Sequence, residues 1–239
     1  MEAMTSVVQE AELAETVIQV LDKGFVALDG ALASDLAVVN GARVSFNQES
    51  DELGERDEGL IRFLIRERHG SPFEHGYFRF LVKAPLFVVR EHHRHRAGHS
   101  YNEWSGRYSK MDAEFYVPDN VRTQVGKPGA YSFEPVDEET KEAARREIEE
   151  NGERAFEAYE RMLEQGVAKE VARAVLPLST YTKYYWSCNP RSLMHFCGLR
   201  NHESAQFEIR EFAAAAESFL ERLMPVTHAA FVANDRTAP

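Results

Sequence analysis

The longest regular pattern in the sequence covers residues 137–165, where apolar side chains recur at helical spacing. The apolar stripe consists of Ile148, Phe156, Tyr159 and Leu163. Charged residues surround this stripe, as in an amphipathic helix with one packed face. Gly166 follows directly and is a typical helix end. We therefore predict one long scaffold helix, which the rest of the fold must accommodate.

Strand patterns precede and follow this helix. In EHGYFRFLVKA, residues 74–84, Phe78, Phe80 and Val82 alternate with other side chains, which predicts a strand with one dry face. Residues 17–21, 24–28 and 179–186 are further β-prone runs. Helical patterns occupy residues 33–45 and 57–70. This mixture predicts an α+β fold.

A basic cluster lies between Arg90 and Arg107. Pro85 suits a first helical turn and Gly98 a helix end, so we predict a helix over residues 84–98 with the cluster in its C-terminal half. At helical spacing one ridge would contain Arg90, Glu91, Arg94 and His95, with Arg96 turned away. The following residues, HSYNEWSGRYS, predict a loop whose amides and hydroxyls suit phosphate oxygens.

A second polar group follows Asn189, a candidate helix cap. We predict a helix through much of residues 190–212, with one stripe that contains Arg191, His195 and His202 and with Arg200 beside it. A short helix over residues 168–177 places Arg173 among apolar neighbours, where its charge would need a partner such as a ligand phosphate. Residues 126–140 read as a surface loop.

The formal net charge of −11 argues against a surface that follows long nucleic acid, because such a surface needs a broad basic face. One basic pocket for a small anion remains compatible with this charge. The N-terminal residues 1–17 lack the pattern of a secretory signal, and no later run is long enough to cross a bilayer, so we expect a cytoplasmic protein. Cys188 and Cys197 are too few for a disulfide framework, and we expect both to be reduced and structural.

Two alternatives compete with anion binding at the basic cluster. Cations at a helix end oppose the helix dipole, by about 0.3–1 kcal/mol each, but this accounts for only one or two of the residues. A metal site would suffer repulsion from the interleaved arginines and lacks partner ligands, so we expect no metal. The residues alone therefore predict a binder of phosphorylated small molecules, and they reveal no reaction.

Several ordered motifs are similar to those of the flavin-dependent thymidylate synthase family. They are ARVSF from Ala42, SPFEH, FLVKAP, RHRAGHSYNEWSGRYS, EFYVP, VARAVLP, NPRSLMHFCGLR and AQFEIR. The signature is the Arg-His-Arg triplet followed by a spacer and a serine. Eight residues separate Arg96 from Ser105, one more than the family's seven, and we place the extra residue near Gly98 or His99.

The resemblance implies roles for individual positions. FAD would be contacted by His69, Ser71, Glu74, Arg94, His95, Arg96, Asn189, Arg191 and His195. The substrate dUMP would be contacted by Glu91, Arg94, Glu103, Ser105, Gly106, Arg107, Arg173 and Arg200. We expect Arg200 to be catalytic, as a fixed cation that stabilises negative charge on the uracil ring. No cysteine nucleophile is implied.

The same resemblance implies an α+β fold with a central, mostly antiparallel sheet flanked by helices and long helices in the C-terminal half. A single domain would cover residues 1–239, in a homotetramer with active sites shared between subunits. The implied reaction converts dUMP to dTMP, with methylenetetrahydrofolate as carbon donor and NADPH as reductant through FAD. The alternative is a catalytically silent nucleotide- and flavin-binding protein of the same fold.

Overall fold

The structure, a computed structural model, describes residues 16–239. Residues 1–15, most of the stretch on which the expectation about a secretory signal rests, lie outside this range. Within it, no helix combines the length and the apolar character that crossing a membrane requires.

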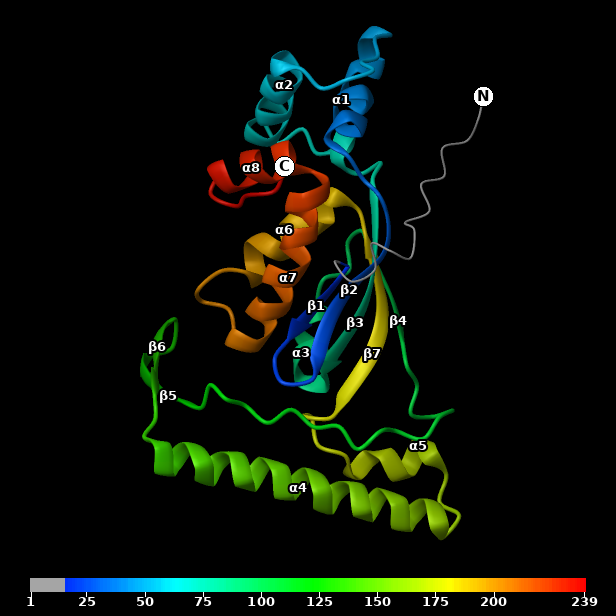
Figure 1. Ribbon diagram of the computed structural model, residues 1–239, viewed down its shortest axis with the longest axis vertical. Coiled ribbons are helices and arrows are strands. Elements are labelled where there is room, and N and C mark those ends of the chain that lie inside the picture. The colour runs from blue at the N-terminus through cyan, green and yellow to red at the C-terminus, as the bar shows by residue number, and fades with distance from the viewer. Residues whose placement is uncertain (1–15) are drawn as a thin grey trace.

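A five-stranded sheet forms the centre of the fold (Figure 1), with every neighbouring pair of strands antiparallel. The order across the sheet is β1 (Val17–Val20), β2 (Gly24–Leu32), β3 (Tyr77–Pro85), β7 (Tyr181–Cys188) and β4 (His99–Glu103). The prediction of an α+β fold around an antiparallel sheet is confirmed. β7 is an interior strand that pairs with both β3 and β4. The two ends of the sheet are therefore described below by the two ends of β7.

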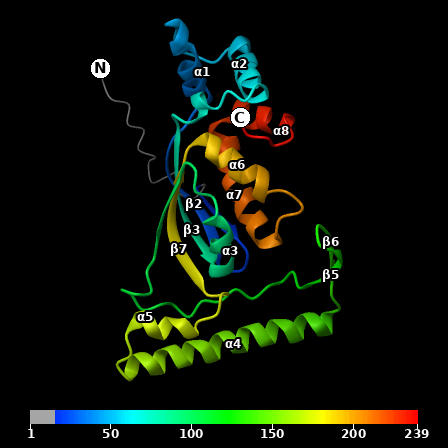
Figure 2. The ribbon, with the colours of Figure 1, turned by 180° about the vertical axis from the view of Figure 1, so that it is seen from behind.

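Helices cover one face of this sheet (Figure 2). They are α3 (Leu86–His92), α6 (Pro190–Arg200) and α7 (Phe207–Leu223). Phe80 of β3 lies 5.8 Å from Phe219 and 4.9 Å from Trp186, measured between ring centroids. These rings are fully buried, and each such side chain contributes roughly 1.5–3 kcal/mol of hydrophobic stabilisation. The predicted dry face of the 74–84 strand is therefore the face under α7.

The two ends of the sheet carry different helices. α1 (Asp35–Arg43), α2 (Glu55–Arg66) and α8 (Pro225–Ala233) pack together at one end. At the other end lie α4 (Glu138–Glu164) and α5 (Lys169–Ala172), as Figure 1 shows. The long scaffold helix is confirmed as α4, which begins where the Asp137 side chain accepts a hydrogen bond from the Thr140 amide. A separate apolar cluster around Met111, Tyr159 and Ala172 holds α4 in place.

One expectation about local structure in this region is wrong. Residues 126–140 are largely a hairpin of β5 (Arg122–Lys127) and β6 (Ala130–Pro135), closed by Gly129 at φ +86°. Mostly exposed side chains on both strands hid the alternation that predicts a strand. The prediction that much of residues 190–212 is helical is confirmed, by α6 and the start of α7, with a break between Arg200 and Phe207.

Candidate active site

The basic cluster lies in a turn, not in the second half of a helix as predicted. α3 ends at His92, and residues 93–98 turn back toward β4. The Tyr101 hydroxyl contacts the backbone oxygens of His92 and His95, at 3.2 and 2.9 Å. The His92 oxygen also accepts from the His95 amide at 3.0 Å, so Tyr101 and this backbone bond together stabilise the turn that ends α3. Sequence periodicity could not reveal this contact across the turn.

Gly98 lets the turn approach the start of α6. Its φ is +72°, and a Cβ atom there would lie 2.2 Å from the Ser192 hydroxyl oxygen. That hydroxyl donates to the backbone oxygen of Ala97 at 3.0 Å. Asn189 caps α6 by accepting from the Ser192 amide at 2.8 Å, as predicted for a helix start. The turn and the first turn of α6 therefore form one unit.

Two adjoining cavities, each of about 620 Å³, lie on either side of this unit. The Arg200 cavity is lined by Arg94, His95, Arg96, Ala97, His99, His195, Leu199 and Arg200. The Arg191 cavity is lined by Arg68, Glu74, Ala97, Gly98, Asn189, Arg191, Ser192, His195, Ala238 and Pro239. Ala97 and His195 line both cavities. Volumes of this size are typical of small-molecule sites.

Most of the predicted flavin-side residues meet in these two cavities, together with Arg200. His69 and Ser71 line neither, although their segment supplies Arg68 and Glu74. The structure adds lining residues that sequence reasoning missed, among them His99 and Ser192. His99 lies within the basic cluster of residues 90–107, but no ligand contact was predicted for it.

The guanidinium of Arg200 is fixed by two side chains. Its Nε donates to Nε2 of His95 at 3.0 Å, and its Nη1 donates to the Glu91 carboxylate at 2.9 Å. Because a guanidinium only donates, His95 Nε2 is unprotonated and the neutral ring carries its proton on Nδ1. Burial, followed by the charge of Arg200, lowers the pKa of His95 to about 4. Burial raises the pKa of Glu91, and Arg200 offsets part of this.

Other cations of the two cavities have no acidic partner. Among residues 16–239, the guanidinium groups of Arg94, Arg96 and Arg68 form no ion pair with a carboxylate. Arg191, in contrast, contacts Glu74 and donates to the backbone oxygen of Pro239 at 2.6 Å. Unpaired guanidinium groups beside a cavity favour an anionic ligand.

Five of the eight predicted dUMP-side residues form a second group at the other end of β4: Glu103, Ser105, Gly106, Arg107 and Arg173. Ser105, Gly106 and Arg107 follow this strand, and a Cβ atom at Gly106 would lie 3.2 Å from Arg173 Cδ. The Arg107 Nε donates to Glu170 at 3.3 Å. Arg173 is exposed, so its expected apolar surroundings are wrong: only Ala172 of its short helix faces inward.

β7 separates the two groups. Arg173 precedes this strand and α6 follows it, and Figure 1 shows α5 and α6 at opposite ends of the sheet. Eight residues of strand span roughly 23 Å at about 3.3 Å per residue. Arg94 and Arg200 therefore lie near one end of β7, and Arg107 and Arg173 near the other. One chain does not bring all four arginines together.

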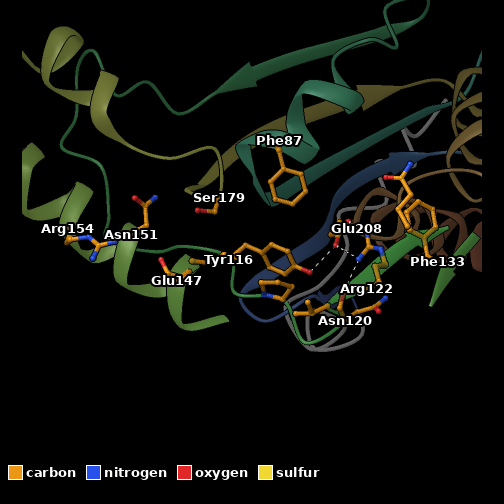
Figure 3. Close-up of a pocket in the computed structure, with 14 residues that line it drawn as sticks. Phe87, Tyr116, Asn120, Arg122, Phe133, Glu147, Asn151, Arg154, Ser179 and Glu208 are labelled. Atoms are coloured by element: carbon orange, nitrogen blue, oxygen red, sulfur yellow. Dashed lines mark hydrogen bonds and ion pairs between the residues drawn. The ribbon is translucent and has the colours of Figure 1, made fainter. Parts of the chain in front are cut away.

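A third cavity, of about 700 Å³, lies elsewhere (Figure 3), and none of the predicted site residues lines it. At its base Glu208 accepts two hydrogen bonds from Arg122, at 3.0 and 2.9 Å, and one from Tyr116 at 3.2 Å. Burial alone would raise the pKa of Glu208, but the bonds from Arg122 and Gln206 hold it below its ordinary value. Because these charges neutralise each other, this cavity has no evident preference for a charged ligand.

Two further features bear on the chemistry. Cys188 and Cys197 are buried and free, and burial raises the pKa of both thiols, which suits the structural role expected of them. In residues 16–239, no group of three or more His, Cys, Asp and Glu side chains is arranged to hold a metal ion.

Comparisons with known proteins agree on one family. The family model described as thymidylate synthase complementing protein matches residues 28–226. A flavin-dependent thymidylate synthase from Streptomyces coelicolor is 49% identical over 228 residues, which cover 90% of this chain and 93% of that protein. One from Thermotoga neapolitana is 45% identical, with 90% of this chain and 94% of that protein covered.

A solved structure is also similar over nearly the whole chain. It is the UMP/dUMP methylase PolB from Streptomyces cacaoi bound with 5-Br dUMP, at a TM-score of 0.85 and 46% identity, covering 93% of this chain and 100% of that one. The same enzyme bound with 5-Br UMP gives a TM-score of 0.84 at 45% identity, with 93% and 99% covered. The chain belongs to the flavin-dependent thymidylate synthase family.

Proposed function

We propose that this protein is a flavin-dependent thymidylate synthase that converts dUMP to dTMP, with methylenetetrahydrofolate as carbon donor and NADPH as reductant through FAD. The observation that carries the proposal is the Arg200 cavity, where unpaired Arg94 and Arg96 lie beside a fixed Arg200 in a chain of net charge −11. The named activity of relatives up to 49% identical, and the dUMP analogue bound by PolB, support the same reaction.

The two adjoining cavities fit an FAD molecule. FAD is a long molecule with a diphosphate and a planar ring system. It therefore needs two connected cavities, with cations where the diphosphate lies. Arg94 and Arg96 in one cavity and Arg68 in the other supply the cations, and Ala97 and His195 connect the two spaces. When bound, FAD would supply hydride transfer, and the residues of these cavities would orient it and exclude water.

The dUMP site is completed by a second copy of the chain in a homotetramer. Glu103, Ser105, Gly106, Arg107 and Arg173 of one subunit would meet Glu91, Arg94 and Arg200 of another. The position of α5 and α6 at opposite ends of the sheet in one chain supports this arrangement. Large apolar side chains exposed on the single chain, among them Phe46 and Tyr108, also favour subunit contacts.

Arg200 would act on the pyrimidine as a pre-positioned positive charge. Glu91 and His95 occupy its Nη1 and Nε, which fixes the plane of the guanidinium before substrate binds. Such a group stabilises negative charge that develops on the uracil ring without giving up a proton. Ser105 would bind substrate through its hydroxyl, because within residues 16–239 that oxygen accepts only from the Arg107 amide and has no histidine as a hydrogen-bond partner.

Residues 1–239 would form a single domain that works in the cytoplasm and needs no resident metal ion. No feature of the described residues favours the catalytically silent alternative over the enzyme.

The test is a purified preparation with its flavin content measured. We expect the absorbance bands of bound FAD, and dTMP formation when dUMP, methylenetetrahydrofolate and NADPH are supplied under low oxygen. Omitting each of the three in turn is the matched control, and each omission should abolish the product. Absence of both flavin and dTMP would overturn the proposal.

A further inference from the structure

His99, the first residue of β4, is held by a single directional contact. The indole Nε1 of Trp186 in β7 donates to Nδ1 of His99 at 2.9 Å, and the two ring planes lie within 12° of each other. Trp186 is buried, with 1% of its surface exposed. Register supports the contact, because β4 and β7 are neighbouring strands that pair His99 with Cys188, two residues from Trp186.

This contact determines where the proton of His99 lies. An indole N–H only donates, so Nδ1 of His99 must accept and the neutral ring carries its proton on Nε2. Protonation of Nδ1 would leave the buried Trp186 N–H without an acceptor, which costs on the order of 1–3 kcal/mol. Burial, followed by the charge of His195, also lowers the pKa of His99 to about 4.

The protonated Nε2 belongs to a side chain that lines the Arg200 cavity. Within residues 16–239 this nitrogen has no hydrogen-bond partner, and it is not among the buried polar atoms. The neighbouring His95, whose ring centroid is 5.9 Å away, has the opposite tautomer because Arg200 donates to its Nε2. The cavity thus combines cations with a neutral N–H donor of fixed direction.

We propose that His99 is a flavin-binding residue that donates its Nε2 hydrogen to an uncharged acceptor of the isoalloxazine ring, and that Trp186 is the positioning residue that fixes this tautomer. The assignment rests on the proposed function. Arg94 and Arg96 suit phosphate oxygens, whereas a neutral donor matches a ring carbonyl or ring nitrogen, where no charge has to be balanced.

The experiment compares His99→Asn with His99→Gln by titrating flavin-free protein with FAD in the absence of dUMP. The shorter Asn amide can still accept from Trp186 but does not reach the position of Nε2, whereas the Gln amide reaches it and can donate. We expect His99→Asn to weaken FAD binding about 3- to 10-fold, as for one lost neutral hydrogen bond, and His99→Gln to remain within about twofold of the wild type. His202→Asn, an exposed histidine outside both cavities, is the matched control.

A second measurement reads the tautomer directly. Nitrogen-15 NMR of histidine-labelled wild-type protein at neutral pH, with His99 assigned by its loss in His99→Asn, should show Nδ1 unprotonated and Nε2 protonated. Addition of FAD should shift the Nε2 resonance.

Three outcomes would overturn the assignment: a proton on Nδ1, unchanged FAD affinity in a folded His99→Asn, or an effect that appears only after dUMP is added. The last would identify the nucleotide as the acceptor. A wild-type protein that binds no flavin would overturn the proposed function as well. Flavin binding by the wild type therefore distinguishes failure of the His99 assignment from failure of the proposed function.

Discussion

Arg200 donates a hydrogen bond to His95 across 3.0 Å, between a group that always donates and a ring nitrogen that must therefore accept. This bond joins the end of α6 to the turn after α3, two segments that are 105 residues apart in the sequence. It holds the permanent positive charge of Arg200 beside the neutral imidazole of His95. The positive charge suits an anionic ligand, and the imidazole stays neutral at physiological pH.

Replacing Arg200 tests its assigned role. In Arg200→Ala, we expect dTMP formation to fall at least about 100-fold, because the positive charge facing the pyrimidine is lost. The content of bound flavin should stay within about twofold of the wild type, since Arg94 and Arg96 remain. Steady-state assays together with the flavin absorbance spectrum measure both quantities. Loss of flavin with the mutation would place Arg200 on the cofactor instead.

Gly98 offers a test of the turn that carries the basic cluster. Gly98→Ala would place a Cβ atom 2.2 Å from Ser192 Oγ at a φ of +72°, so we expect weaker FAD binding as well as lower stability. Gly129→Ala is the matched control, because it has a φ of +86° but nothing within 4 Å. The control should lose only roughly 1–2 kcal/mol of stability from its left-handed backbone and keep its flavin affinity. Equal effects of the two changes on FAD affinity would argue against the role of this turn.

The sequence predicted those helices and strands whose formation depends on one local pattern of residues. α4 and β3 follow from a single period, and the cap at Asn189 follows from one residue and its neighbours. The early end of α3 could not be predicted, because it depends on Tyr101, which reaches back from β4 to two backbone carbonyls. Long-range partners of this kind leave no mark in local periodicity.

The site was predictable to a similar degree. The signature and its companion motifs predicted eight of the sixteen residues that line the two cavities. The pairing of Trp186 with His99 could not be predicted, since Trp186 lies outside the quoted motifs and is 87 positions from His99. Arg122 and Glu208 were also missed, with 86 positions between them.

The pair Arg122 and Glu208 should contribute to stability and not to flavin binding. Because Glu208 is 3% exposed, Arg122→Met would leave a buried carboxylate unpaired, and we expect the free energy of unfolding to fall by about 3–5 kcal/mol. The double change Arg122→Met with Glu208→Gln should recover part of this loss. Urea unfolding measures the stability, and FAD titration of the folded variants should give wild-type affinity. Weakened FAD binding in a folded variant would contradict the separation of this cavity from the site.

Acid should destabilise the protein in part through two histidines. The pKa values of His95 and His99 are about 4 in the folded protein, against about 6.5 for an ordinary histidine. Between these values the unfolded chain binds more protons, so stability falls as the pH falls from about 6.5 to about 4 and is insensitive to these rings above 6.5.

Carboxylates also titrate between pH 6.5 and 4. The test therefore compares the loss of stability over this interval in the wild type with the loss in histidine variants. His95→Gln and His99→Gln should each show a smaller loss of stability between pH 6.5 and 4 than the wild type, as measured by urea unfolding at several pH values. An identical slope in the wild type and both variants would mean that the rings are not held neutral by their surroundings.

The central claim is that one active site combines the Arg200 end of one subunit with the Arg173 end of another. The most direct measurement mixes two inactive variants, Arg200→Ala and Arg173→Ala, under conditions that exchange subunits. A shared site predicts that dTMP formation returns to roughly a quarter of the wild-type rate, because about one site in four receives two intact halves. A mixture that stays as inactive as its components, although mixed oligomers have formed, would contradict the account.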